Sequence, residues 1–217
     1  MDGKDWDREL VVFSHNGDID GAKEALLSGA DIHYDNNFAL MAACTKGHLQ
    51  VVKYLIDQGA NIHARDDYAL RNASHDGHFG IVKYLVEKGA DIHANEDWAL
   101  RGASGNGHLE IVKYLVEQGA DIHAEGEWAL VAASMSGHFQ ICDYLVSQGC
   151  DPQNVIDSDI SEANKQWAID FVKARDLSNK LTNELGEKSS KAERLVSSID
   201  EDADAPVKKP KYTRQKI

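Results

Sequence analysis

Cysteine and long apolar runs are scarce in this 217-residue chain. The three cysteines, Cys44, Cys142 and Cys150, form no CxxC pair, and their number is odd. This argues against a disulfide framework or a zinc knuckle, and we expect buried free thiols in a reducing compartment. No apolar run approaches the ~20 residues that span a bilayer. Residues 1–7 are polar and contain no signal-peptide core, so we expect a soluble, non-secreted chain.

Positive charge is scarce as well. The chain has 23 Lys and Arg against 36 Asp and Glu, a net charge of −13, and nearly all of the excess lies in residues 1–150. Such an acidic segment repels nucleic-acid phosphates and anionic lipids. We therefore expect neither a nucleic acid nor a membrane as a partner.

What the chain does contain is an internal repeat with a period of 30 residues. Two glycine columns mark it, with members at Gly17, Gly47, Gly77, Gly107, Gly137 and at Gly29, Gly59, Gly89, Gly119, Gly149. The segment 83–86, KYLV, recurs at 113–116. Fixed periods of this length are typical of solenoids.

Each unit is predicted to contain two short helices. In the second unit the first helix covers about Ala39–Thr45 and ends at Gly47, where glycine adopts left-handed geometry at low cost. The second covers about Leu49–Asp57, with apolar residues at helical spacing. One unit cannot bury its apolar face alone, so neighbouring units must stack. The alternative is a globular helical bundle in which the similarity between the units is accidental. Five units with the same period argue against this alternative.

Stacking predicts core columns, formed by Leu40, Leu70, Leu100, Leu130 and by Ala43, Ala73, Ala103, Ala133. Cys150 stands where earlier units carry Ala, as expected of a small core residue.

The unit resembles the ankyrin repeat, whose pattern is TPLHxAAxxGHxxIVxxLLxxGADxN. Gly107-His108 matches its turn, Ile111-Val112 its second helix and Gly119-Ala120-Asp121 its exit, and the resemblance covers about residues 8–151. It implies an all-α ankyrin-repeat solenoid of paired short helices, which binds a protein partner through its concave groove.

Two departures from the family pattern matter. The unit is shorter, by residues missing from the finger between repeats, and aromatic-Ala pairs replace the Thr-Pro that opens the first helix. Asn37, Asp67 and Asp97 are expected to cap that helix instead, whereas Glu127 caps poorly. This short, aromatic variant is similar to the ankyrin repeats of giant DNA viruses.

Two histidine columns invite a metal-binding interpretation, with members at His48, His78, His108, His138 and at His33, His63, His93, His123. Equivalent atoms in stacked repeats lie about 8–10 Å apart. Two zinc ligands must lie within roughly 4 Å of each other. One histidine column alone therefore cannot supply a zinc site. We expect the histidines to form structural hydrogen bonds, and we expect no metal and no cofactor.

The candidate partner-binding residues form stripes along the stack. The aromatic column Phe38, Tyr68, Trp98, Trp128 either covers the short loop or contacts a partner. The family resemblance adds the two residues before each turn glycine, which are Thr45-Lys46, His75-Asp76, Gly105-Asn106 and Met135-Ser136. It also adds Arg71 and Arg101, which stand at the position of the TPLH histidine. The candidate site is Tyr68, Arg71, His75, Asp76, Trp98, Arg101, Asn106, Trp128 and Met135. Variation between repeats at these positions fits a partner surface, and it equally fits drift at unconstrained sites.

The domain organisation follows from where the repeat ends. Residues 1–151 form the array of about five repeats, and residues 152–186 form a C-terminal capping or amphipathic helix. Ile160 and Ala163 keep the register of Leu130 and Ala133. Residues 187–217 are expected to be a disordered charged tail. Its cluster Lys208, Lys209, Lys211 is either a nuclear import signal or simply solvated.

These patterns predict a monomeric, cytoplasmic protein-interaction module rather than an enzyme, because no catalytic motif is present. A viral host-directed adaptor is the narrower expectation, with residence in the host cytoplasm. The alternatives are a substrate adaptor for a ubiquitin-ligase-type complex and, less favoured, an enzyme.

Overall fold

A computed structural model describes residues 5–203, with the side chains of residues 5–193. Contacts divide the chain into two units, Met1–Asp170 and Phe171–Ile217, which are described separately below. The described residues form twelve α-helices and no strand. An all-α solenoid is therefore confirmed.

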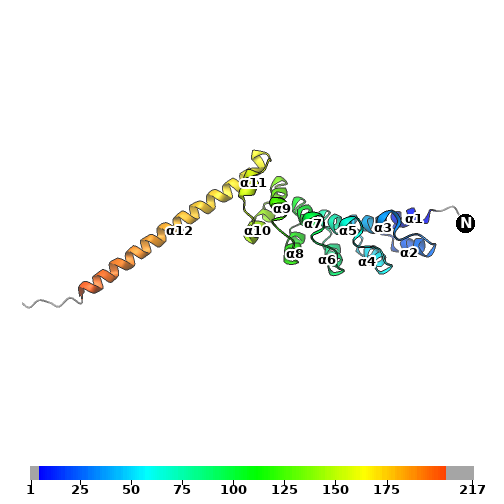
Figure 1. Ribbon diagram of the computed structural model, residues 1–217, viewed down its shortest axis with the longest axis horizontal. Coiled ribbons are helices and arrows are strands. Elements are labelled where there is room, and N and C mark those ends of the chain that lie inside the picture. The colour runs from blue at the N-terminus through cyan, green and yellow to red at the C-terminus, as the bar shows by residue number, and fades with distance from the viewer. Residues whose placement is uncertain (1–4, 204–217) are drawn as a thin grey trace, which may run out of the picture. The chain divides into compact units, whose positions relative to one another are not determined.

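The first unit is a row of helix pairs. In each pair, helix A runs antiparallel to helix B, and successive pairs lie side by side (Figure 1). The A helices are α1 Trp6–Asn16, α3 Tyr34–Thr45, α5 Ala64–His75, α7 Ala94–Gly105 and α9 Ala124–Met135. The B helices are α2 Ile19–Leu27, α4 Leu49–Asp57, α6 Phe79–Glu87, α8 Leu109–Glu117 and α10 Phe139–Gln148. The predicted bounds of α4 are confirmed.

The predicted core columns are buried. Leu40, Leu70, Leu100 and Leu130 expose at most 1% of their surface, and Ala43, Ala73, Ala103 and Ala133 expose none. The B helices add Val and Leu positions at helical spacing to the same core. The alanines allow the helices to approach closely, and the leucines fill the space between neighbouring pairs.

The turn between helices A and B requires glycine for two reasons. Gly47 has a φ of +79°, which is unfavourable for residues with a side chain. A Cβ atom at Gly47 would lie 2.7 Å from the His78 ring of the next repeat. The turn position is thus determined both by its own backbone and by the neighbour stacked on it.

The connection between repeats differs from the prediction. Helix A was expected to begin at its aromatic-Ala pair, but the helical segment starts earlier and contains three left-handed residues. In α5 these are Arg65, Asp66 and Asp67, with φ of 53°, 55° and 52°. Asp and Asn tolerate this conformation better than most residues, which accounts for their frequency at these positions.

The C-terminal end of the array is covered by α11 Gln153–Asp157 and the first turns of α12 Glu162–Ala203. Ser134 Oγ donates to the carbonyl of Asn164 at 2.7 Å, and Ala168 is fully buried. Ala163 is exposed, so the prediction that it continues the alanine column is wrong. The chain turns at α11 before α12 begins, and this shifts the register of the cap.

The second unit contains the rest of α12, which remains helical to Ala203. Leu177, Leu181 and Leu185 expose 60%, 52% and 65% of their surface. The expected start of a disordered tail at residue 187 therefore falls inside a helix. Residues 204–217, including Lys208, Lys209 and Lys211, lie outside the described part of the chain. Within the described residues, no helix is both long and apolar enough to cross a membrane.

Candidate functional site

The aromatic column lies half exposed along the A helices. Phe38, Tyr68 and Trp128 expose 39%, 37% and 40% of their surface, and Trp98 is somewhat less exposed. Trp98 lies against its own helix because Gly102 leaves room: a Cβ there would be 2.9 Å from the ring. Each ring thus packs on the stack and also presents a face to solvent.

Arg71 lies between two of these rings. Its guanidinium carbon is 5.2 Å from the centre of the Tyr68 ring and 5.7 Å from that of Trp98, which are cation–π distances. The His75 ring also stacks on Trp98, with 5.8 Å between the ring centres. We call Tyr68, Arg71, His75 and Trp98 the Arg71 cluster. The structure therefore brings together four of the nine predicted site residues.

The hydrogen bonding of Arg71 is incomplete. Its Nη2 donates to the carbonyl of Arg65 at 3.3 Å. Its Nε is buried and has no hydrogen-bond acceptor among the described residues. A buried donor without an acceptor costs about 1–3 kcal/mol. The Arg71 cluster thus contains one unused donor of a charged group.

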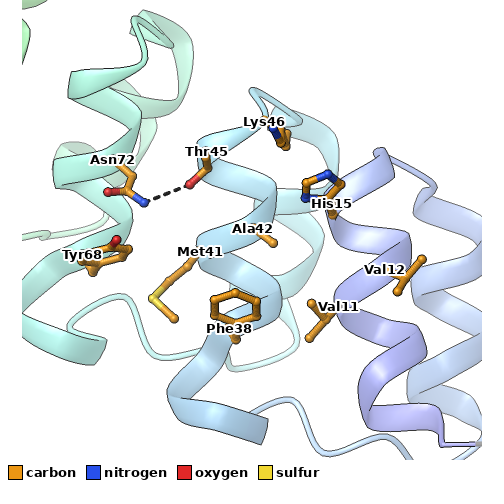
Figure 2. Close-up of a pocket in the computed structure, with 10 residues that line it drawn as sticks. All are labelled: Val11, Val12, His15, Phe38, Met41, Ala42, Thr45, Lys46, Tyr68 and Asn72. Carbon is orange, nitrogen blue, oxygen red and sulfur yellow. Dashed lines mark hydrogen bonds between the residues drawn. The ribbon is translucent and has the colours of Figure 1, made fainter.

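An apolar pocket of about 540 Å³ lies beside this cluster (Figure 2). Its walls come from α1, α3, α5 and the residue that follows α3: Val11, Val12, His15, Phe38, Met41, Ala42, Thr45, Lys46, Tyr68 and Asn72. Asn72 donates to Thr45 Oγ1 at 2.9 Å and so holds one side of the pocket in place. Tyr68 and Asn72 also line a smaller hollow of about 180 Å³ together with Arg71 and Trp98.

Sequence reasoning missed most of this pocket. Val11 and Val12 were not expected to contribute, because the first repeat lacks an aromatic at the column position, and Met41 is not at a predicted groove position. The part of the wall that the sequence did indicate consists of Phe38 and Tyr68 from the aromatic column and the groove pair Thr45-Lys46.

Arg101 occupies the same repeat position as Arg71 but has different neighbours. Its Nη1 lies 3.6 Å from Glu125 Oε2. A hydrogen bond with Glu125, and the negative charge of that residue, raise the pKa of Glu96, while Arg101 lowers it in part. Arg101 thus faces carboxylates of its own chain, whereas Arg71 faces aromatic rings.

The other five predicted site residues lie outside the Arg71 cluster, although Asp76 contacts its His75, and Arg101 and Trp128 line one small hollow. Asp76 accepts from His75 Nδ1 at 2.7 Å, and the side chain of Asn106 donates to the carbonyl of Gly102 at 2.9 Å. Met135 is 45% exposed at the end of α9, and Trp128 lies two repeats away from the apolar pocket. The candidate site therefore concentrates on α1, α3, α5 and α7.

One histidine column ties each turn to the preceding repeat. His48, His78 and His108 use Nε2 to contact the carbonyls of His15, Thr45 and His75 at 2.9–3.0 Å. Each ring also lies against the turn glycine of that repeat. These contacts are the structural hydrogen bonds expected from the sequence.

The other histidine column pairs with buried acceptors. The Nδ1 of His93 lies 3.1 Å from Asp97 Oδ1, which also accepts the backbone N–H of Asp121 at 2.9 Å. Asn37, Asp67 and Glu127 make the corresponding contacts. The prediction that Asn37, Asp67 and Asp97 cap helix A is wrong. Their left-handed backbone directs them toward the next repeat instead.

The comparison with known families agrees with this architecture. A family model described as ankyrin repeats (3 copies) matches residues 10–96 and 95–156, more than half of the chain. The chain belongs to the ankyrin-repeat family. A search of curated proteins found no match to the sequence. Ankyrin repeats are generally protein–protein interaction modules, and the family is typically not enzymatic.

Proposed function

We propose that this ankyrin-repeat protein binds a segment of a partner protein along its A helices. An apolar side chain of the segment enters the apolar pocket, and a carboxylate of the segment contacts Arg71. The observation that carries this proposal is the position of Arg71, whose guanidinium lies against the Tyr68 and Trp98 rings. Arg71 lines a hollow that shares Tyr68 and Asn72 with the pocket.

A carboxylate is the ligand that best completes the hydrogen bonding of Arg71. Guanidinium and carboxylate groups match in geometry and form strong charge-assisted hydrogen bonds. Arg71 is already held between Tyr68 and Trp98, so little side-chain freedom is lost on binding. Trp, Tyr and Arg are also the residues most enriched at interface hot spots.

The apolar pocket supports the second half of the proposal. Its volume of about 540 Å³ falls within the range of roughly 300–1,000 Å³ typical of ligand pockets. Phe38, Met41 and Val11 form much of its wall (Figure 2). A Leu, Met or Phe side chain of the partner is the group that such a wall favours, because its burial removes apolar surface from water on both sides.

The net charge of the protein, −13, limits the charge of the other residues in the bound segment. Further acidic residues would be repelled by the array, so the flanks of the bound carboxylate are expected to be neutral or basic. The predicted ligand is thus a segment with one apolar anchor and one acidic residue near it.

The test is to select peptides from a random displayed library on the full chain and to measure their binding by fluorescence anisotropy. Arg71→Gln should weaken binding by at least about 10-fold, or about 1.4 kcal/mol. Arg101→Gln is the matched control from the next repeat and should have a smaller effect, because Arg101 already pairs with Glu125. Lys83→Gln, on α6, should leave the affinity nearly unchanged. Peptides that lose affinity for the Lys83 variant but not for the Arg71 variant would place the interface on the B helices and refute the proposal.

A further inference from the structure

The last full repeat differs from the others in one set of three residues at the junction between stacked repeats. Three positions meet there in every repeat: the histidine, the buried acceptor four residues later, and the small residue that precedes the next loop. The earlier sets are His33, Asn37, Ala60; His63, Asp67, Ala90; and His93, Asp97, Ala120. In the last set, His123, Glu127 and Cys150, the acceptor is longer and the alanine is replaced by a thiol. Two residues of the same set thus change together, and both changes introduce or extend a metal-ligating group.

The structure places these three groups close together. One ligand atom from each of His123, Glu127 and Cys150 lies within 4.8 Å of the other two. Among the residues that the structure describes, no other group of three or more His, Cys, Asp and Glu side chains comes as close. Glu127 and Cys150 are buried, at 5% and 4% exposure. His123 has a side-chain exposure of 57%, so the set is open to solvent on one side.

We infer that His123, Glu127 and Cys150 form a binding site for one Zn²⁺ ion, with solvent as the fourth ligand. Nitrogen, carboxylate oxygen and sulfur are the donors that zinc prefers, and three protein ligands plus water is a common zinc coordination. A thiolate among them disfavours Mg²⁺ and Ca²⁺. The expectation of no metal site treated each histidine column alone, whereas this set combines residues from three columns.

The geometry needs only a small adjustment. Zinc bonds of about 2.0–2.3 Å place tetrahedral ligand atoms ~3.5 Å apart, so atoms that now lie within 4.8 Å must converge by about 1.3 Å at most. Glu127 Oε1 is 2.8 Å from His123 Nδ1, and these two atoms would separate slightly to admit the ion. Glu127 Oε2 accepts the backbone N–H of Asp151 at 2.8 Å, which fixes the carboxylate in place.

Zn²⁺ binding requires loss of the thiol proton of Cys150 and one particular tautomer of His123. The Cys150 thiol, which now points toward the carbonyl of Ile122 at 3.6 Å, releases its proton to water and binds as thiolate. His123 binds the ion through the Nδ1 lone pair, which requires the tautomer with its proton on Nε2. The ion would link the last repeat to the loop that begins the cap.

Cobalt(II) titration of the full chain provides the test, because a cobalt–thiolate bond gives a charge-transfer absorption band that histidine alone does not. This matters in a chain with ten histidines. The wild type should show this band, saturate at one equivalent and lose the band when Zn²⁺ is added. Cys150→Ala, which restores the residue of the earlier repeats, should lack the band. Cys142→Val, which restores the residue of the earlier repeats at another buried cysteine, should keep it.

Absence of the band in the wild type, or its persistence in Cys150→Ala, would overturn the site. Circular dichroism shows whether each variant is folded. If Cys150→Ala does not fold, Glu127→Asp provides the second test, since it leaves the thiol in place and shortens the carboxylate as in the earlier repeats. Glu127→Asp should weaken cobalt binding, and unchanged affinity would count against the site.

A variant with a second copy of the site, built in the preceding repeat, tests whether these three residues are sufficient to bind the ion. D97E combined with A120C copies the last set onto His93 and should give a folded chain that binds a second equivalent. A folded variant that still binds a single equivalent would overturn the claim that these three ligands suffice.

Discussion

The carboxylate of Asp97 accepts the backbone N–H of Asp121, 24 residues further along the chain, at 2.9 Å. The same oxygen lies 3.1 Å from Nδ1 of His93, and Asp97 is only 6% exposed. A buried carboxylate is tolerated when donors surround it. Here one donor comes from its own repeat and one from the next, so this contact couples neighbouring units.

Replacement of Asp97 tests this coupling. Asp97→Ala leaves the N–H of Asp121 and the ring of His93 without their acceptor, and we expect a loss of about 1–3 kcal/mol in the free energy of unfolding. Asp97→Asn should cost much less, because Asn37 makes the same contacts in the second repeat. Urea denaturation measures both. Equal losses for the two variants would mean that the hydrogen bonds contribute little.

Gly77 and Gly89 form a matched pair for the turn. Both have positive φ, at 83° and 94°, but only at Gly77 would an added Cβ meet another group, 2.5 Å from the His108 ring. Gly89→Ala should cost about 1 kcal/mol from backbone strain alone. Gly77→Ala should cost clearly more, and part of that excess should vanish when His108→Ala is added. An additive double mutant would show that the ring and the glycine are not coupled.

Leu100→Ala tests the core register. Leu100 is 1% exposed in the central repeat, so its truncation leaves a cavity that costs about 2–5 kcal/mol. Stacked repeats share their stability with neighbours, so chemical denaturation should show the loss across the whole array. A cost below about 0.5 kcal/mol would contradict the assigned core.

The buried thiols predict a loss of stability at alkaline pH. Burial, and in addition the charge of Asp143, raise the pKa of Cys142 from 9.0 to about 12. The folded chain therefore keeps a proton that the unfolded chain loses, so the stability falls as pH rises from about 9 to about 12. At pH 10 the expected loss from this thiol is about 1 kcal/mol.

Cys142→Val is the control, since Val occupies this position in α4, α6 and α8. It should remove this part of the pH dependence measured by denaturation at pH 8 and pH 10. The native thiols should also react slowly with a thiol reagent until the chain is unfolded. An unchanged pH dependence in the Val variant would show that Cys142 does not contribute.

The repeat, its helices and its core could be predicted from local sequence patterns. The period, the turn glycines and the apolar spacing are local and recur five times, so they specify helix A, helix B and the columns of Leu100 and Ala103 with little ambiguity. The burial of the three cysteines, expected from their odd number and the absence of a CxxC pair, is confirmed.

The contacts that residues at equivalent repeat positions make could not be predicted in this way, because they depend on how the repeats stack. Arg71 and Arg101 share a repeat position, yet one faces aromatic rings and the other faces Glu125. Asp97 resembles a helix cap in sequence but bonds to the next repeat, and the apolar pocket combines residues from three A helices. These contacts join positions from different repeats. They depend on how the units stack and on side chains that differ between them, which a local pattern does not encode.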